Sequence, residues 1–156
     1  NQQCYELARL MRHAGIETQQ RRCMLGSSTA ALAWTDGRSK VTFDREYLRK
    51  NIRSLGGFQS VMSVLVHELL HTDSDEGSHI HDEDFYRAHH DLLIKSDVFS
   101  LALKAAVVFS RSLMRSDDLG ARDVSAKLTR EVNALFNLGT HDAQDDQEDD
   151  PMSLAA

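Results

Sequence analysis

The sequence predicts an α+β domain in which helices dominate and a small β-sheet packs against a buried helix. Apolar residues recur with helical spacing in several segments, and a hairpin pattern stands near residue 36. A long apolar segment in the middle of the chain also carries two histidines four residues apart. With 156 residues and a hydrophobic content of 41%, the chain is long enough for one domain with its own core.

The first third of the chain is expected to form a helix, a hairpin and a second, short helix. Apolar residues at positions i, i+3, i+4 and i+7 predict the first amphipathic helix, and they are Cys4, Leu7, Ala8 and Met11. The Asp36-Gly37 step predicts a tight turn between strands at 30–34 and 40–43. Asp44 is expected to cap a short helix that reaches about Arg49.

The last part of the chain is expected to form three further helices. The pattern predicts one helix over 82–95. The next should be capped by Ser96 or Asp97 and should reach Met114. A last amphipathic helix is expected over 123–139.

The segment Phe58–His71 carries the most informative pattern, His67-Glu68-Leu69-Leu70-His71. It is apolar on nearly every side, as a buried helix is, and Gly56-Gly57 is expected to break the chain just before it. Histidines at i and i+4 project from the same helical face, so both imidazoles can bind one metal ion. Zinc lowers the pKa of a bound water, and Glu68 is close enough to act as its general base. The pattern therefore predicts a zinc hydrolase.

A catalytic zinc site usually has a third protein ligand and leaves the fourth position to water. The candidates are His79 and His81, which follow the helix after a polar segment. A metzincin would have a histidine where this chain has Gly77, so that class is excluded. A carboxylate from a later helix is a further alternative, with Asp91 and Glu131 as the residues available. We favour His81, partly because of a family resemblance.

The segment from His81 to Tyr86 (HDEDFY) resembles the third-ligand segment of the SprT-like and WLM-type zinc proteases. In those families an aromatic pair opens the next helix and packs beneath the site. The likeness covers roughly residues 58–93. It implies a zincin-like fold and a small intracellular metallopeptidase domain, with zinc held by His67, His71 and His81. It implies no particular substrate.

Several residues beside the proposed site have two plausible roles. Asp82 is expected either to accept a hydrogen bond from a ligating imidazole or to stabilise the start of the next helix. Tyr86 is a candidate donor to an oxyanion, although a core position is the more common one for such a tyrosine. We interpret His89 and His90, two turns beyond His81, as structural or surface residues.

A peptide substrate is expected to pair with an edge strand, as extended substrates do in zincin-like proteases. The candidate edges are the segments 31–34 and 41–43. The alternative is an ordinary strand that packs Leu32 and Trp34 into the core.

Charge is distributed unevenly along the chain. Residues 1–53 carry ten Lys or Arg against five Asp or Glu, whereas 142–156 carry six acidic residues and no basic one. We expect a metallopeptidase domain over 1–141 and an acidic disordered tail over 142–156. A nucleic-acid patch is an alternative interpretation of the basic residues, which are Arg9, Arg12, Arg21, Arg22, Arg45, Arg49, Lys50 and Arg53.

No apolar run in the sequence has the length of a membrane helix. Two cysteines, Cys4 and Cys23, are too few for a disulfide framework and lack zinc-ligand spacing, which favours a cytoplasmic protein. The chain begins without methionine and is expected to belong to a larger polypeptide or complex. Two alternatives remain: a zinc-containing regulatory or binding module without proteolytic activity, and a DNA-associated protease of the crosslink-repair type.

Overall fold

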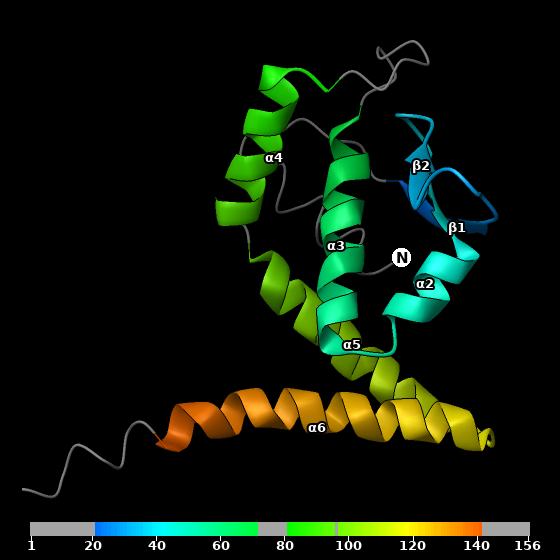
Figure 1. Ribbon diagram of the computed structural model, residues 1–156, viewed down its shortest axis with the longest axis vertical. Coiled ribbons are helices and arrows are strands. Elements are labelled where there is room, and N and C mark those ends of the chain that lie inside the picture. The colour runs from blue at the N-terminus through cyan, green and yellow to red at the C-terminus, as the bar shows by residue number, and fades with distance from the viewer. Residues whose placement is uncertain (1–20, 72–80, 96, 142–156) are drawn as a thin grey trace, which may run out of the picture.

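The computed structural model describes residues 21–71, 81–95 and 97–141, which form a helix-dominated α+β fold with a small sheet (Figure 1). The strands are β1 (Arg22–Gly26), β2 (Ala33–Thr35) and β3 (Lys40–Asp44), and the helices are α2 (Arg45–Asn51), α3 (Leu55–Leu70), α4 (Glu83–Lys95), α5 (Val98–Met114) and α6 (Leu119–His141). Helix α3 stands between the sheet on one side and α4 on the other, while α6 crosses α5 at one end of the molecule. The predicted fold class is confirmed.

The sheet has the order β1-β3-β2, with β1 parallel and β2 antiparallel to β3. The predicted hairpin is confirmed, and Gly37 in its turn has a φ of 71°, in the left-handed region that glycine tolerates. Because β3 is central, the segment 41–43 is not an edge, and that alternative was wrong. Strand β2 lies at an edge of the described sheet. Strand β1 was not predicted.

Helix α3 begins earlier than the sequence predicted. Ser54 is its N-cap, and the Ser54 side chain accepts a hydrogen bond from the Gly57 backbone nitrogen at 3.1 Å. The Gly56-Gly57 pair therefore lies inside the helix and does not break the chain before it. Glycine is required at 57 because a Cβ there would lie 1.8 Å from the Asn51 carbonyl oxygen at the end of α2. The close approach brings α2 against the first turn of α3.

Helix α3 is the centre of the core, which confirms the prediction of a buried helix. Its most buried residues include Leu65, Val66 and Leu69. They belong to one cluster with residues of β3, α4, α5 and α6, among them Val41, Phe43, Leu92, Leu101, Ala102, Ala106 and Leu128. The segment from His67 to His71 at the end of α3 is thus fixed by packing from several directions.

The remaining helices largely follow the prediction. Asp44 caps α2 and Asp97 caps α5, through bonds from the Tyr47 and Ser100 backbone nitrogens of 2.8 and 3.0 Å. Helix α6 begins at Leu119, before the predicted Asp123, because an Asp118 side-chain oxygen accepts from the Gly120 nitrogen and opens the helix earlier. Among the helices described, none has the length and apolar character that crossing a membrane would require. The predicted helix near Cys4 and the acidic segment 142–156 lie outside the described residues.

Candidate metal centre

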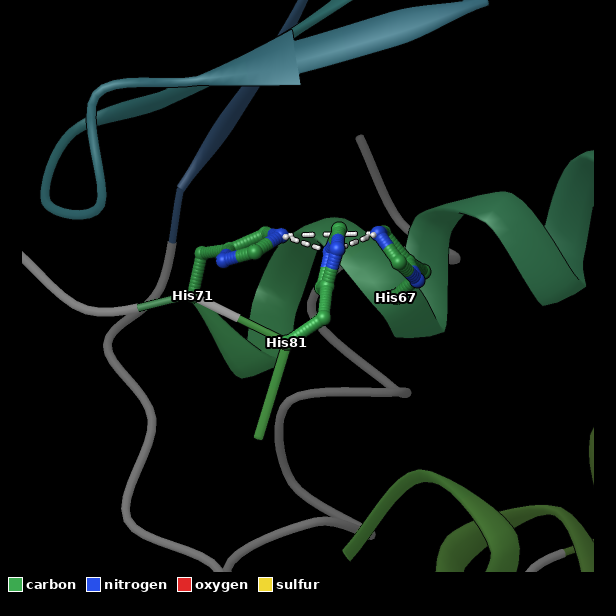
Figure 2. A group of neighbouring side chains, drawn as sticks. All are labelled: His67, His71 and His81. Atoms are coloured by element: carbon green, nitrogen blue, oxygen red, sulfur yellow. Dashed lines mark hydrogen bonds between the residues drawn. The ribbon is translucent and has the colours of Figure 1, made fainter. Parts of the chain in front are cut away.

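Three histidine side chains converge at one end of α3, and their Nε2 atoms point toward one another (Figure 2). The Nε2 of His81 lies 3.1 Å from that of His67 and 3.3 Å from that of His71. The Nε2 atoms of His67 and His71 are 3.4 Å apart. Each nitrogen offers a lone pair to the shared centre when its ring is neutral and carries its proton on Nδ1, so the group can hold a metal ion.

The end of α3 positions two of these residues. His67 lies in the last turn, and His71 is the C-cap residue that follows the helix, with an extended ψ of 137°. The helix therefore ends one residue before the predicted second ligand, yet the two nitrogens still meet. His71 is buried, His67 is half-buried and His81 is exposed, so the centre opens to solvent on the side of His81.

A buried arginine fixes the end of α3 against the sheet. The guanidinium of Arg21 donates to the backbone carbonyl oxygens of Glu68, at 2.6 Å, and of His71. It also donates to the carbonyl oxygen of Gly37, at 2.7 Å, and to the hydroxyl of Thr35, at 3.1 Å. The last carbonyls of a helix lack partners within it, and a cation there is also favourable for the helix dipole. Because Arg21 is only 4% exposed, its inclusion in a surface nucleic-acid patch was wrong.

Phe85 supports all three imidazole rings from the first turn of α4. Its ring centroid lies 5.0 Å from that of His67, 4.8 Å from that of His71 and 4.7 Å from that of His81. The expected packing beneath the site is therefore confirmed for Phe85. It was wrong for Tyr86, which is 58% exposed and lies at the rim, its ring 6.0 Å from that of His81.

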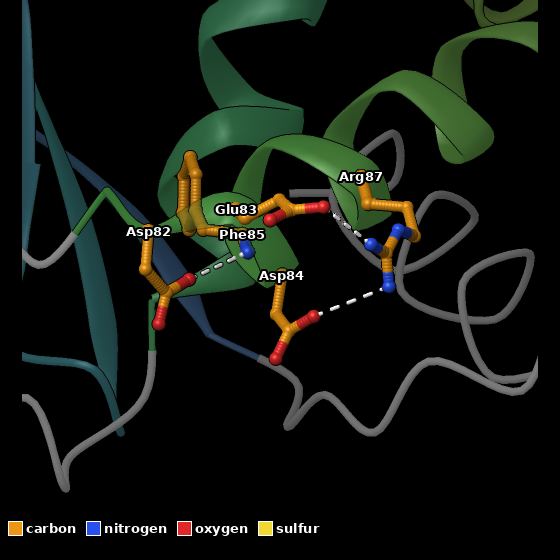
Figure 3. Close-up of polar contacts among 5 residues, drawn as sticks. All are labelled: Asp82, Glu83, Asp84, Phe85 and Arg87. Atoms are coloured by element: carbon orange, nitrogen blue, oxygen red, sulfur yellow. Dashed lines mark hydrogen bonds and ion pairs between the residues drawn. The ribbon is translucent and has the colours of Figure 1, made fainter.

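The acidic segment next to His81 forms the start of α4 (Figure 3). A carboxylate oxygen of Asp82 accepts a hydrogen bond from the Phe85 backbone nitrogen at 2.8 Å. Glu83 and Asp84 form ion pairs with Arg87 at 2.7 and 3.4 Å. Of the two roles expected for Asp82, the structure has the one at the helix terminus, where it holds Phe85 in place under the histidines.

Glu68 is 6% exposed and lines a pocket beside the histidines. The pocket has a volume of about 360 Å³ and lies between the start of β2, the middle of α3 and α4. Its lining residues are Leu32, Ala33, Ser63, Val64, His67, Glu68 and His89. Ala33 faces the core, whereas Leu32 is 54% exposed, so the expectation that Leu32 packs into the core was wrong.

His89 is a site residue that the sequence did not reveal. Its ring lies edge-on to that of His67, with centroids 5.8 Å apart, and stacks on Phe85 at 6.4 Å. It also donates a hydrogen bond to the backbone carbonyl oxygen of Ser63. Burial lowers the pKa of His89, which favours the neutral ring. A signal was available: residues 81, 85 and 89 recur at the i, i+4 spacing that aligns side chains on one helical face.

Glu131, another candidate ligand, does not join the centre. Glu131 accepts a hydrogen bond from the Leu55 backbone nitrogen at 2.7 Å, at the opposite end of α3. His79 lies outside the described residues. Within the described ranges, the potential ligands that gather in a group of three are His67, His71 and His81.

Comparison with known proteins leaves the chain without a family assignment. No protein-family model matches it, and neither a curated protein nor a solved structure is significantly similar to it. The functional argument therefore rests on the geometry of the site.

Proposed function

We propose that this protein is a zinc-dependent metallopeptidase that hydrolyses peptide bonds. One observation carries the proposal: three histidine Nε2 atoms meet at the end of α3, where the buried residue Glu68 lines the same pocket as His67. Histidine ligands next to a carboxylate that can move a proton are the groups that hydrolytic zinc sites employ.

The spacing of the nitrogens fits zinc. In a tetrahedral site with Zn–N bonds of about 2.0–2.1 Å, two ligand nitrogens lie about 3.3–3.4 Å apart. The three separations are 3.1, 3.3 and 3.4 Å, so the nitrogens stand close to three corners of such a tetrahedron. His67, His71 and His81 would hold the ion.

When bound, zinc lowers the pKa of water toward neutrality and polarises a carbonyl group. Glu68 takes the proton of the attacking water as its oxygen bonds to the peptide carbonyl carbon. Glu68 then gives this proton to the amide nitrogen as the carbon–nitrogen bond breaks, which releases an amine and a carboxylic acid. Glu68 is buried, so its carboxyl group would act on the water and the amide away from bulk solvent.

A peptide is the substrate that the surroundings of the pocket favour. Strand β2 lies at an edge of the described sheet, and Leu32 and Ala33 at its start line the pocket that Glu68 enters. An extended peptide that pairs with this edge would gain main-chain hydrogen bonds and lie across the histidines. The walls of the pocket would then keep part of the surrounding water away from the bond that is cleaved.

The resemblance to SprT-like and WLM-type zinc proteases agrees with this proposal. It rests on His67, Glu68 and His71, and on the spacing from His81 to Phe85. On this basis we propose an intracellular metallopeptidase domain. No nucleic acid or membrane is needed for the proposed reaction.

The replacement Glu68→Gln tests the proposal. Glutamine keeps the shape of the side chain but cannot accept the proton, so hydrolysis of a labelled unfolded protein should fall by about 10²–10⁴-fold while zinc stays bound. Glu83→Gln is the matched control because Glu83 is exposed at the start of α4. Unchanged hydrolysis by Glu68→Gln would contradict the assigned role.

A further inference from the structure

A second depression lies next to the pocket that Glu68 enters. It has a volume of about 560 Å³, and its walls are Leu32, Asp44, Glu46, Tyr47, Arg49, Lys50 and Arg53. Leu32 lines both cavities, so its exposed side chain is the point where one meets the other. A chain bound across the histidines can therefore continue past Leu32 over α2.

The two carboxylates of this depression already have partners. Glu46 forms an ion pair with Arg49 at 2.8 Å. Asp44 accepts hydrogen bonds from the backbone nitrogens of Tyr47, at 2.8 Å, and Ser28, at 3.1 Å, which hold its pKa below the usual value. Asp44 is therefore ionised at neutral pH, and the backbone N–H groups that donate to it offset part of its negative charge.

Lys50 and Arg53 supply the positive charge that remains. Both are exposed, Lys50 in the last turn of α2 and Arg53 just after it, and neither forms an ion pair with another residue of the described ranges. A negatively charged group that enters the depression would meet these two cations while the rest of the chain rests on apolar Leu32. The lining thus combines an apolar contact with two side chains able to bind carboxylates.

We propose that this depression selects acidic peptides, so that the preferred substrate carries Asp or Glu residues a few positions from the bond that is cleaved. The inference rests on the proposed peptidase function. A peptide is the occupant that the geometry favours because Leu32 lines both this depression and the pocket beside His67 and Glu68, so a peptide cleaved there continues directly into it. Carboxylates along that peptide can bind Lys50 and Arg53.

The test uses four peptides that are identical around the cleaved bond. Two carry three glutamates, at the N-terminus or at the C-terminus, and the other two carry three glutamines at the same places. The zinc-loaded protein should cleave the better glutamate peptide about 5- to 10-fold more efficiently in kcat/KM, as two exposed ion pairs allow. Added salt should reduce this preference. The double variant Lys50→Gln, Arg53→Gln should lose it.

The matched control is Lys104→Gln, Arg130→Gln, which removes the same charge from α5 and α6 at positions that do not line the depression. It should keep the preference for glutamate. Equal cleavage of all peptides would overturn the inference and leave the peptidase function intact. Equal loss of the preference in both double variants would also overturn it, since a general charge effect would then be responsible.

Binding to the Glu68→Gln protein separates this inference from the peptidase proposal. If no peptide is cleaved by the wild type, the peptidase proposal fails, and tighter binding of the glutamate peptides still supports a site for acidic peptides at Lys50 and Arg53. A depression that binds a single-stranded oligonucleotide through Lys50 and Arg53, and does not bind the glutamate peptides, would overturn the peptide assignment.

Discussion

The guanidinium of Arg21 donates a hydrogen bond to the backbone carbonyl oxygen of His71, 50 residues further along the chain. The same side chain binds the carbonyl oxygen of Glu68, so one buried cation holds the backbone of the proposed base and of one proposed ligand. It also binds the Gly37 turn of the sheet. The end of α3 is thereby fixed relative to β2, which borders the pocket.

Replacing Arg21 with Met should weaken both the fold and the centre. The carbonyl oxygens of Gly37, Glu68 and His71 would lose a charged donor in a buried place, at a cost of about 2–4 kcal/mol in the free energy of unfolding. Zinc affinity should fall at least about tenfold because His71 is no longer held in place. Urea unfolding and zinc titration measure the two effects. Arg22→Met, at the exposed neighbouring position, should change neither; equal effects of the two replacements would contradict the role of Arg21.

Replacing His89 with Ala should lower peptidase activity without removing zinc. The His89 ring contacts that of His67 and forms part of the pocket wall, but its side chain is not in the group of three nitrogens. We expect kcat/KM to fall about tenfold, or about 1.4 kcal/mol, with unchanged zinc content. His90→Ala is the matched control because His90 is exposed on the same helix. Loss of zinc from His89→Ala would show that His89 belongs to the metal centre itself.

The two adjacent glycines of α3 should respond in opposite ways to alanine. A Cβ at Gly57 would overlap the Asn51 carbonyl oxygen, whereas one at Gly56 meets no atom within 4 Å. Gly57→Ala should destabilise the protein by about 1–3 kcal/mol or more, since the backbone of α2 must move. Gly56→Ala should stabilise it by up to about 1 kcal/mol through helix propensity. Thermal unfolding of both variants measures the two effects. An unchanged unfolding temperature for Gly57→Ala would contradict the close approach of α2 and α3.

Asp36 should make the stability of the protein depend on pH in acid. Hydrogen bonds from the Ser39 hydroxyl and from backbone N–H groups of the turn hold the pKa of Asp36 well below 3.8. Because the folded-state pKa is depressed, the ionised carboxylate stabilises the fold above pH 3.8, and this contribution is lost as pH falls toward the folded-state pKa. Asp36→Asn should therefore be destabilised relative to wild type at neutral pH and less so in strong acid. A difference in urea midpoint that stays constant with pH would contradict this linkage.

Local patterns in the sequence predicted the parts of the site that depend on helical spacing and capping. His67 and His71 meet because they are four residues apart, and Asp44 and Asp97 cap the helices they precede. The position of His81 followed from its distance to Phe85 in a resembling motif. These relationships involve neighbours in the chain, which a sequence displays directly.

The rest depends on contacts between distant segments. The sequence displays Arg21 as one basic residue among several, because its partners lie 14 to 50 residues away. The spacing of residues 81, 85 and 89 puts His89 on the same face as Phe85, but the sequence does not show that this face packs against α3. The start of α3 was missed for a similar reason. Gly57 looks like a helix breaker in the sequence, whereas in the fold its missing side chain lets α2 approach α3.

Zinc content of the purified protein, measured by elemental analysis, tests the central claim most directly. We expect one zinc per chain in the wild type and in His90→Ala, and almost none in His67→Ala and His81→Ala, because two imidazoles hold zinc far more weakly than three. Circular dichroism of the four proteins shows whether the histidine variants remain folded. A wild type without zinc after purification in zinc-containing buffer, or folded His67→Ala and His81→Ala variants that both retain it, would contradict a metal centre formed by these three histidines.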